Sequence, residues 1–292
     1  MGWRSALFYG AGLAAASALL AACAEPPGKQ GVAPDAGARR IVSLDYCADQ
    51  YVLALADRGA IAALSPHAEE DYAHLRREAA GLAKVRPRAE DVLALRPDLV
   101  VRTYGGGPKA AALYEAAGVP VLQIGYASDL AAVRTVLRDA AAGLGAQDRG
   151  AALIAEMDAR LAAINARRDN KDAQRPASAL YITPGGVTAG AGTLIDEMIA
   201  AAGYHNFSAA PGWRALPLEQ LAREKPDFLA ASFFASSARD LDAWSPARHP
   251  VIRSLMEKTP TVALTSASTS CNAWYLVGAV EALAAGPDAG EK

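Results

Sequence analysis

Short apolar runs and helical apolar patterns alternate over residues 40–127. The run Arg40-Ile-Val-Ser-Leu44 is typical of a strand, and the apolar positions within 48–56 recur at helical spacing. The alternation continues with a strand over 60–64, a helix over 90–95, a strand over 99–102, a helix over 109–117 and a strand over 119–124. Strands that alternate with helices across short connections form a parallel sheet covered on both faces. We therefore expect an N-terminal α/β lobe over residues 40–127.

The pattern changes over residues 128–172 to a long stretch rich in Ala, Leu and Arg. Ser128 is expected to be the N-cap of a helix, and the Gly143-Leu-Gly145 sequence is expected to break it once. Because an α-helix rises ~1.5 Å per residue, a helical segment of this length can lie along both neighbouring units as a stiff strut. We expect it to join two lobes.

The β-α pattern returns after this segment and predicts a C-terminal lobe over residues 173–286, followed by a tail over 287–292. The expected strands cover 177–182, 228–232 and 262–264, and the expected helices cover 193–202 and 218–224. The predicted fold class is therefore α/β, with two lobes that are each a parallel-sheet α/β sandwich and a long helix between them.

An internal repeat links the two lobes. Glu90 is followed by six residues and then Pro97-Asp98, and Glu219 is followed by six residues and then Pro226-Asp227. In each copy a two-turn helix starts with a carboxylate, proline ends it because proline has no backbone N–H to donate, and an apolar strand begins. The repeat indicates that both lobes follow one design.

Composition narrows the class of protein. The chain has 292 residues, of which 52% are hydrophobic and 21% charged, so it can bury a core in each of two domains. The formal net charge is -2 and there is no long run of Lys or Arg, which argues against a nucleic-acid partner.

The first residues resemble an export signal. Arg4 gives a positive n-region, residues 6–20 are apolar, and Leu20-Ala-Ala-Cys23 ends the stretch, so residues 1–23 are expected to be a signal peptide. Leu-Ala-Ala-Cys also resembles the lipobox of bacterial lipoproteins, which would make Cys23 a lipid anchor and the only attachment to a membrane. The alternative is ordinary cleavage at Ala22-Cys23-Ala24 with a soluble product. Residues 24–39, rich in Pro, Gly and Ala, are expected to form a flexible tether.

Four motifs occur together within residues 40–285: Arg40–Leu44, Pro97–Val101, Ala202–Asn206 and the paired E-x6-P-D units. Through these motifs the chain resembles the periplasmic binding proteins of ABC importers that carry ferric siderophores, haem and cobalamin. The resemblance implies a monomeric carrier without a cofactor, which captures a chelated metal (a ferric siderophore or a corrinoid such as cobalamin) between its lobes. The carrier then delivers it to a permease that works with a cytoplasmic ATPase. Haem is the alternative ligand.

The resemblance also implies two docking carboxylates. In the family one surface glutamate on each lobe docks onto basic residues of the permease, and the matching positions are Glu90 and Glu219. A local alternative remains, because the helix dipole favours a carboxylate in the first helical turn by about 0.3 to 1 kcal/mol without any partner.

The ligand is expected at loops that follow strand ends, as in open α/β sheets generally. Ring systems need flat apolar walls and anionic groups need Arg, so aromatic residues and arginines in these loops are candidates. The alternative for each is core packing or, for Arg, a surface position. The candidate ligand-binding residues are Tyr46, Arg102, Tyr104, Tyr181, Trp213, Arg214, Phe234 and Trp274.

Cys47 and Cys271 are the cysteines that remain after export. In an oxidising compartment such a pair is expected to form a disulfide, here between the start of the first lobe and the last helical stretch. Free buried thiols and a thiolate metal site are the alternatives. The four histidines are scattered without an i,i+4 pair, so no metal-ion site is expected.

A secreted α/β hydrolase is the main alternative from another class of protein, because parallel sheets support many chemistries. The sequence has no G-x-S-x-G elbow and no persuasive order of Ser, His and Asp, so we expect that the protein is not an enzyme. A structural lipoprotein that binds another protein is a third reading.

Overall fold

The computed structural model describes residues 40–169, 177–183, 185–232 and 249–287. The predicted signal peptide with Cys23, the tether and residues 288–292 lie outside the described residues. Within the described part, no helix is both long and apolar enough to cross a bilayer.

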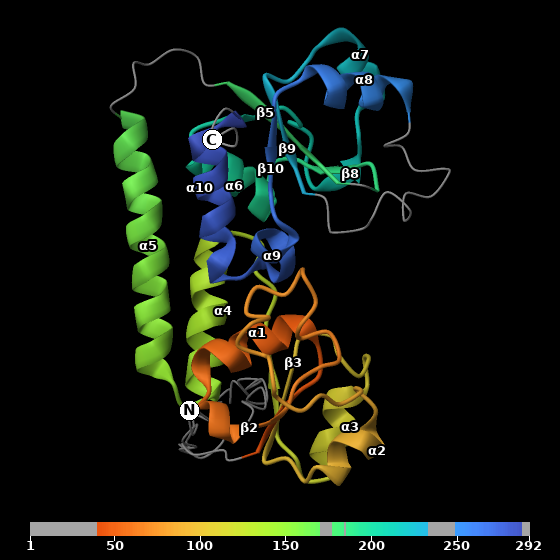
Figure 1. Cartoon of the computed structure of the whole chain (residues 1–292), viewed down its shortest axis with the longest axis vertical. Coiled ribbons are helices and arrows are strands. Elements are labelled where there is room, and N and C mark those ends of the chain that lie inside the picture. Colours follow the sequence, from red (N-terminus) through yellow and green to blue (C-terminus); the bar gives the residue numbers. More distant parts are fainter. Residues whose placement is uncertain (1–39, 170–176, 184, 233–248, 288–292) are drawn as a thin grey trace, which may run out of the picture. The chain divides into compact units, whose positions relative to one another are not determined.

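The first lobe is built on a four-stranded parallel sheet. Its strands are β1 (Ile41–Ser43), β2 (Ile61–Ala63), β3 (Leu99–Arg102) and β4 (Val121–Gln123), in the order β2-β1-β3-β4. The helices are α1 (Tyr46–Leu55), α2 (Ala89–Ala94) and α3 (Ala110–Ala116), with a 3-10 turn, η1, at Arg58–Ala60 (Figure 1).

Alternation along the strands divides the core of this lobe into two layers. Ile41 and Leu99 face a cluster that contains the buried residues of α1, whereas Val42 and Val100 face the buried residues of α2 and α3. The first sheet is therefore covered on both faces, as the alternating pattern predicted.

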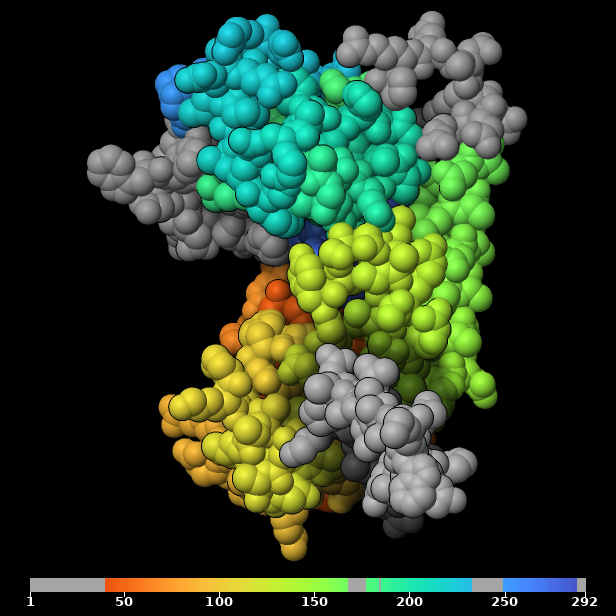
Figure 2. Space-filling model, turned by 180° about the vertical axis from the view of Figure 1, so that it is seen from behind, coloured from red at the N-terminus to blue at the C-terminus, as the bar shows by residue number. Residues whose placement is uncertain are grey.

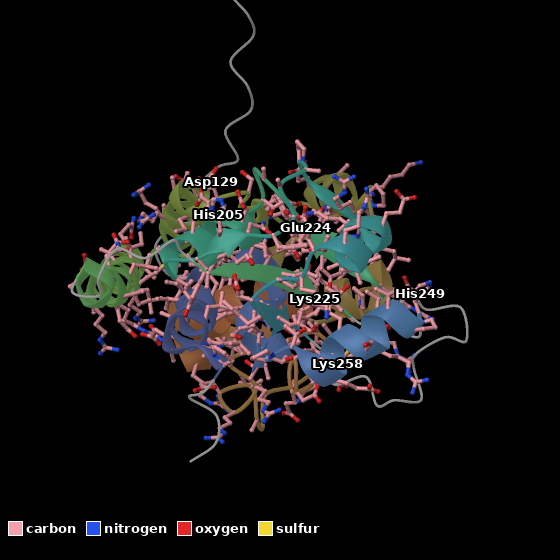
Figure 3. All side chains as sticks on the ribbon, turned by 90° about the horizontal axis from the view of Figure 1, so that it is seen from above. Asp129, His205, Glu224, Lys225, His249 and Lys258 are labelled. Atoms are coloured by element: carbon pink, nitrogen blue, oxygen red, sulfur yellow. A yellow bond between two sulfur atoms is a disulfide. The ribbon has the colours of Figure 1, made fainter. Side chains whose placement is uncertain are left out.

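The second lobe repeats this plan. Its parallel sheet has the order β10-β9-β5-β7, from β5 (Ser178–Ile182), β7 (His205–Asn206), β9 (Phe228–Ala231) and β10 (Thr261–Ala263). Helices α6 (Leu194–Ala201) and α10 (Val277–Ala285) pack on one face, and α7 (Leu218–Arg223) and α8 (Pro250–Lys258) pack on the other. Figure 3 shows His249 and Lys258 at the two ends of α8.

The paired E-x6-P-D units hold equivalent places in the two lobes. The backbone N–H of Asp98 donates to the carbonyl of Arg40 at 3.0 Å, and the backbone N–H of Asp227 donates to the carbonyl of Ser178, also at 3.0 Å. In each lobe this bond joins the strand after the motif to the first strand of the sheet. The internal repeat is thus also a structural repeat.

A helical hairpin stands between the lobes in the sequence, where a strut with one break was predicted. It consists of α4 (Leu130–Gly143) and α5 (Gln147–Asp169), and Gly145 turns the chain between them with a φ of 67°. The helices lie side by side (Figure 1), so close that a Cβ on Gly150 would fall 2.4 Å from the Cβ of Ala141. The N-cap of α4 is Asp129, which accepts from the Ala132 N–H, and not Ser128 as predicted.

Helix α5 connects the two lobes. Near its start Arg149 donates to the carbonyl of Leu55 in the first lobe, and further along Arg160 pairs with Glu281 of α10 at 2.6 Å. Its 23 residues correspond to a length of about 34 Å. Figure 2 shows its green residues exposed along one side of the described chain.

Several elements of the second lobe were not predicted from the sequence. Strand β7 and helix α8 are two of them, and strands β6 (Val187–Ala189) and β8 (Trp213–Ala215) form an antiparallel pair beside the second sheet. Three short elements also precede α10: α9 (Ser266–Thr269) and the 3-10 turns η3 (Ser270–Asn272) and η4 (Trp274–Leu276).

Candidate functional site

Each sheet has a topological switch point, which is a pair of adjacent strands whose outgoing connections run in opposite directions along the sheet. In the first sheet the switch point lies between β1 and β3, and in the second between β5 and β9. Ligands of open α/β sheets bind outside the carboxyl ends of the strands at such points. The residues just after these four strands are therefore the candidate site.

Asp45 organises the switch point of the first sheet. Its carboxylate caps α1 by accepting from the Ala48 N–H at 2.9 Å. It also accepts from the backbone N–H groups of Thr103, Tyr104 and Gly105 at 2.8, 3.1 and 2.9 Å, and from the Thr103 hydroxyl. A buried carboxylate with this many donors holds the end of β1 and the loop after β3 together. The only signal for Asp45 in the sequence is its position between the first strand and the first helix.

Three aromatic side chains gather at this edge and form what we call the tyrosine cluster: Tyr46, Tyr72 and Tyr104. The ring of Tyr46 lies 4.9 Å from that of Tyr72 and 6.3 Å from that of Tyr104, both edge to face. Tyr104 is 56% exposed, so its ring is available to a ligand. Burial, with negative charge from Asp45, raises the pKa of Tyr46 and of Tyr104, so their phenols are neutral at neutral pH.

Arg102 has a different role from the predicted one. Its side chain is buried, and it donates to the carbonyls of Gly105 and Gly107 at 2.9 Å each. The guanidinium therefore holds the loop after β3, and its observed bonds do not point to a ligand anion.

Tyr126 is an aromatic residue that the sequence analysis missed. It follows β4 at the carboxyl edge of the first sheet and is 73% exposed. The signal was present, since Tyr126 lies two positions beyond the end of the strand expected over residues 119–124, just as Tyr104 lies two positions beyond the strand over residues 99–102.

In the second lobe Trp213 and Tyr181 form an aromatic pair. Their rings lie 5.9 Å apart, edge to face, with Tyr181 buried and Trp213 52% exposed. Arg214 is exposed. In the register of β8 against β6, Arg214 lies opposite Thr188, and Trp213 lies opposite Ala189. Because successive strand residues point to opposite faces, Trp213 and Arg214 cannot both face one ligand.

Trp274 lies in the core, which corrects its assignment to the ligand site. Its ring contacts those of Tyr51 and Tyr275, each at 5.2 Å, and it is 7% exposed. Core packing, the alternative considered for every aromatic candidate, holds here. The remaining candidate, Phe234, lies outside the described residues.

A short segment over residues 269–272 connects the carboxyl edges of the two sheets. In the second lobe the hydroxyls of Thr269 and Ser232, directly after β9, lie 2.8 Å apart. In the first lobe Cys271 is paired with Cys47, and the Ser270 hydroxyl donates to the Tyr72 carbonyl at 3.0 Å. The segment thus touches both switch points, which brings the tyrosine cluster and the edge of the second sheet to the same region of the chain.

This two-lobed α/β fold has counterparts among known proteins. The model of the periplasmic binding protein family matches residues 41–233. The chain belongs to the periplasmic binding protein family. This periplasmic binding protein is also 30% identical over 220 residues to cobalamin-binding proteins of two strains of Halobacterium salinarum. The matched region covers 73% of this chain, and it spans only 58% of the length of those relatives.

Solved structures agree with the family. The periplasmic heme-binding protein RhuT from Roseiflexus sp. RS-1 is 25% identical, with a TM-score of 0.66 over 85% of this chain and 97% of RhuT. The periplasmic vitamin B12 binding protein BtuF of Vibrio cholerae is 18% identical, with a TM-score of 0.59 over 85% of this chain and 95% of BtuF, and shows a shared fold. These relatives are named as binding proteins and not as enzymes.

In this periplasmic binding protein the predicted docking carboxylates occupy matching positions. Glu90 is exposed in the first turn of α2, and Glu219 lies in the first turn of α7 with its side chain 96% exposed. Glu219 approaches Arg223 one helical turn later at 4.0 Å, which in solvent is a weak interaction. Both carboxylates are accessible to a partner.

Within the described residues no group of three or more His, Cys, Asp or Glu side chains could hold a metal ion. Figure 3 shows His205 and His249 apart, on different elements of the second lobe. His74 is used in packing, since its ring stacks on that of Tyr275 at 4.1 Å.

Proposed function

We propose that the protein is the substrate-binding component of an ABC importer and that it captures a corrinoid between the carboxyl edges of its two sheets. The observation that carries this proposal is a pair of exposed aromatic rings. Tyr104 lies in the loop after β3, and Trp213 lies on β8 with its ring 5.9 Å from that of Tyr181 on β5. Flat apolar walls with neutral hydroxyl groups suit a large ring system that carries many amide side chains. The cobalamin-binding relatives support the same ligand class.

The positions of the arginines favour a corrinoid over an anionic ferric siderophore. Arg102 is engaged by carbonyls of its own loop, and Arg214 lies on the face of β8 opposite to Trp213. A polyanionic chelate needs guanidinium groups that face it. The described arginines at the strand ends do not meet this need.

Haem is the second candidate ligand. It is favoured by the phenol of Tyr104, which is exposed beside the ring of Tyr46 and can approach a ligand iron, and by the likeness to RhuT. We do not propose that the protein holds a metal of its own; the metal belongs to the ligand.

The partner is proposed to be an ABC permease that works with a cytoplasmic ATPase. Glu90 and Glu219 are proposed to pair with basic residues of the permease. The two carboxylates are supported by their exposure and by their matching places in the repeated motif. We further propose export to the periplasm as a monomer anchored through Cys23, with Cys47 and Cys271 bonded. Protein residues then supply all contacts to the ligand, and no reaction is catalysed.

Titration of the ligand-free chain over residues 24–292, which leaves out the proposed lipid anchor and is called the mature chain below, tests the ligand class. Cyanocobalamin, haemin and a ferric siderophore are added separately while tryptophan fluorescence is recorded. We expect saturable quenching by cyanocobalamin and recovery of the same unmodified corrinoid, with most of the quenching lost in Trp213→Phe. Saturation by haemin alone, with a shifted Soret band that Tyr104→Phe abolishes, would select haem. The carrier proposal fails if none of the three compounds saturates, or if a compound is chemically changed.

A further inference from the structure

The carboxylate of Asp45 binds one face of a loop that carries an exposed aromatic ring. Three successive backbone N–H groups, at Thr103, Tyr104 and Gly105, point to one of its oxygens at 2.8, 3.1 and 2.9 Å. Successive N–H groups that converge in this way form an anion-binding concavity. Here the anion is a side chain of the protein itself.

Arg102 binds the carbonyl groups of the same loop, since its guanidinium donates to the carbonyl oxygens of Gly105 and Gly107. The loop also approaches the end of β1 closely, because a Cβ on Gly105 would lie 2.5 Å from the carbonyl oxygen of Leu44. The backbone at Tyr104 is therefore fixed by a carboxylate on its N–H side and by a guanidinium on its carbonyl side.

The ring of Tyr104, in contrast, is more than half exposed, and its ring contact is with Tyr46, next to Asp45 in the sequence. Since the side chain has few restraints of its own, the direction of its Cα–Cβ bond depends on the backbone that Asp45 holds. A binding group is most effective when a supporting shell fixes it before the ligand arrives.

We propose that Asp45 is a positioning residue for the ligand site and that it acts through Tyr104, whose ring it aims at the ligand from the switch point of the first sheet. This inference rests on the proposed function for the ligand, but the hold of Asp45 on the loop can be measured without any ligand.

The test replaces Asp45 by Asn in the mature chain. Both oxygens of Asp45 accept hydrogen bonds, one from the Ala48 N–H and the other from the N–H groups of the loop. In Asn one of these oxygens is replaced by an NH2 group that cannot accept, so hydrogen bonds that hold the loop or the helix are lost. The matched control is Asp49→Asn. Asp49 lies in α1, the helix that Asp45 caps, and is also buried, but it accepts from the N–H and hydroxyl of Ser65 at 3.1 and 2.6 Å and not from the loop.

The first readout is amide hydrogen exchange of the ligand-free chain. We expect faster exchange at residues 103–105 in Asp45→Asn and an unchanged rate there in Asp49→Asn. The second readout is cyanocobalamin affinity, which we expect to fall by about tenfold to a hundredfold in Asp45→Asn, as for loss of hydrogen bonds to a charged group. Asp49→Asn should keep the affinity of the unmodified chain.

A double-mutant cycle separates positioning from general damage to the fold. In a Tyr104→Ala background, Asp45→Asn should change cyanocobalamin affinity by no more than about twofold, because the group through which Asp45 acts is gone. An equal loss in both backgrounds overturns the proposal, and so does unchanged exchange at residues 103–105. If the unmodified chain binds none of the three compounds, the proposed function fails, and the exchange comparison alone then decides whether Asp45 holds the loop.

Discussion

Removal of the bond between Cys47 and Cys271 is expected to lower the free energy of unfolding by about 3 to 5 kcal/mol. The two cysteines are 224 residues apart in the sequence, and their Cα atoms lie 5.3 Å apart. A cross-link that closes so long a loop lowers the entropy of the unfolded chain, and the chain-entropy relation gives about 5 kcal/mol at 25 °C.

Two features of the folded state reduce this value. Cys271 and Asn272 have φ values of 66° and 46°, a left-handed conformation that costs non-glycine residues about 1 kcal/mol or more each. Once the bond is absent the segment can relax and recover part of this cost. Other contacts persist, such as the bond from the Asn272 amide to the Ala127 carbonyl at 2.9 Å, so the segment should stay docked.

The assay is equilibrium unfolding in guanidinium chloride of the unmodified mature chain and of Cys47→Ser with Cys271→Ser, each with and without dithiothreitol. We expect the unmodified chain to lose stability when reduced and to match the double variant, which should not respond to reductant. For a chain of this size the loss corresponds to about 2 to 4 °C in Tm per kcal/mol. Equal midpoints for the unmodified chain with and without reductant, or two free thiols in the mass of the unreduced protein, would refute the reasoning.

Three further predictions concern other parts of the molecule. Glu90→Lys with Glu219→Lys should leave ligand affinity unchanged and abolish uptake in cells, and normal uptake would contradict their docking role. Gly105→Ala should cost about 1 to 3 kcal/mol of stability in denaturant unfolding, because its Cβ would meet the Leu44 carbonyl at 2.5 Å. Gly59→Ala is the control, because its φ, like that of Gly105, is not positive and an added Cβ would meet nothing within 4 Å. Burial raises the pKa of Asp49 to about 6, so the folded state binds its proton more tightly than the unfolded state does. Stability should therefore fall as pH rises from about 4 to about 6, and this part of the slope should be missing in Asp49→Asn; an identical pH profile for both proteins would count against the raised pKa.

Much of the fold could be predicted because local signals and tertiary structure agree. The strand expected over residues 99–102 has the same bounds as β3. All four of its residues are buried, as is typical of a strand in a parallel sheet that is covered on both faces. The pair β6 and β8 was missed because strands of three residues with exposed positions such as those of β8 carry no period that a sequence can reveal.

The site was predicted less well than the fold because burial and bonding partners decide it. Trp213 and Trp274 are the same residue type near predicted cleft loops, yet one is 52% exposed and the other packs against Tyr51 in the core. Arg102 was a reasonable partner for an anion until the carbonyls of Gly105 and Gly107 were found to hold it. Hydrogen bonds from a side chain to a nearby loop leave no periodic signal in the sequence.

The topology also relates the proposed docking carboxylates to the ligand site. A helix that leads into a parallel strand runs back across the sheet, so it begins near the carboxyl edge of the sheet and ends near the amino edge. Helix α2 leads into β3 in this way, which puts Glu90 toward the edge that carries the tyrosine cluster. The pKa of Tyr114 supports this placement, because burial raises it while both Arg102 at the end of β3 and Glu90 act on it. Glu219 holds the same place before β9 in the second lobe. A permease that binds both carboxylates would therefore contact the two sheets at the edges where we propose that the ligand binds, which in the first lobe is the edge that carries Tyr104.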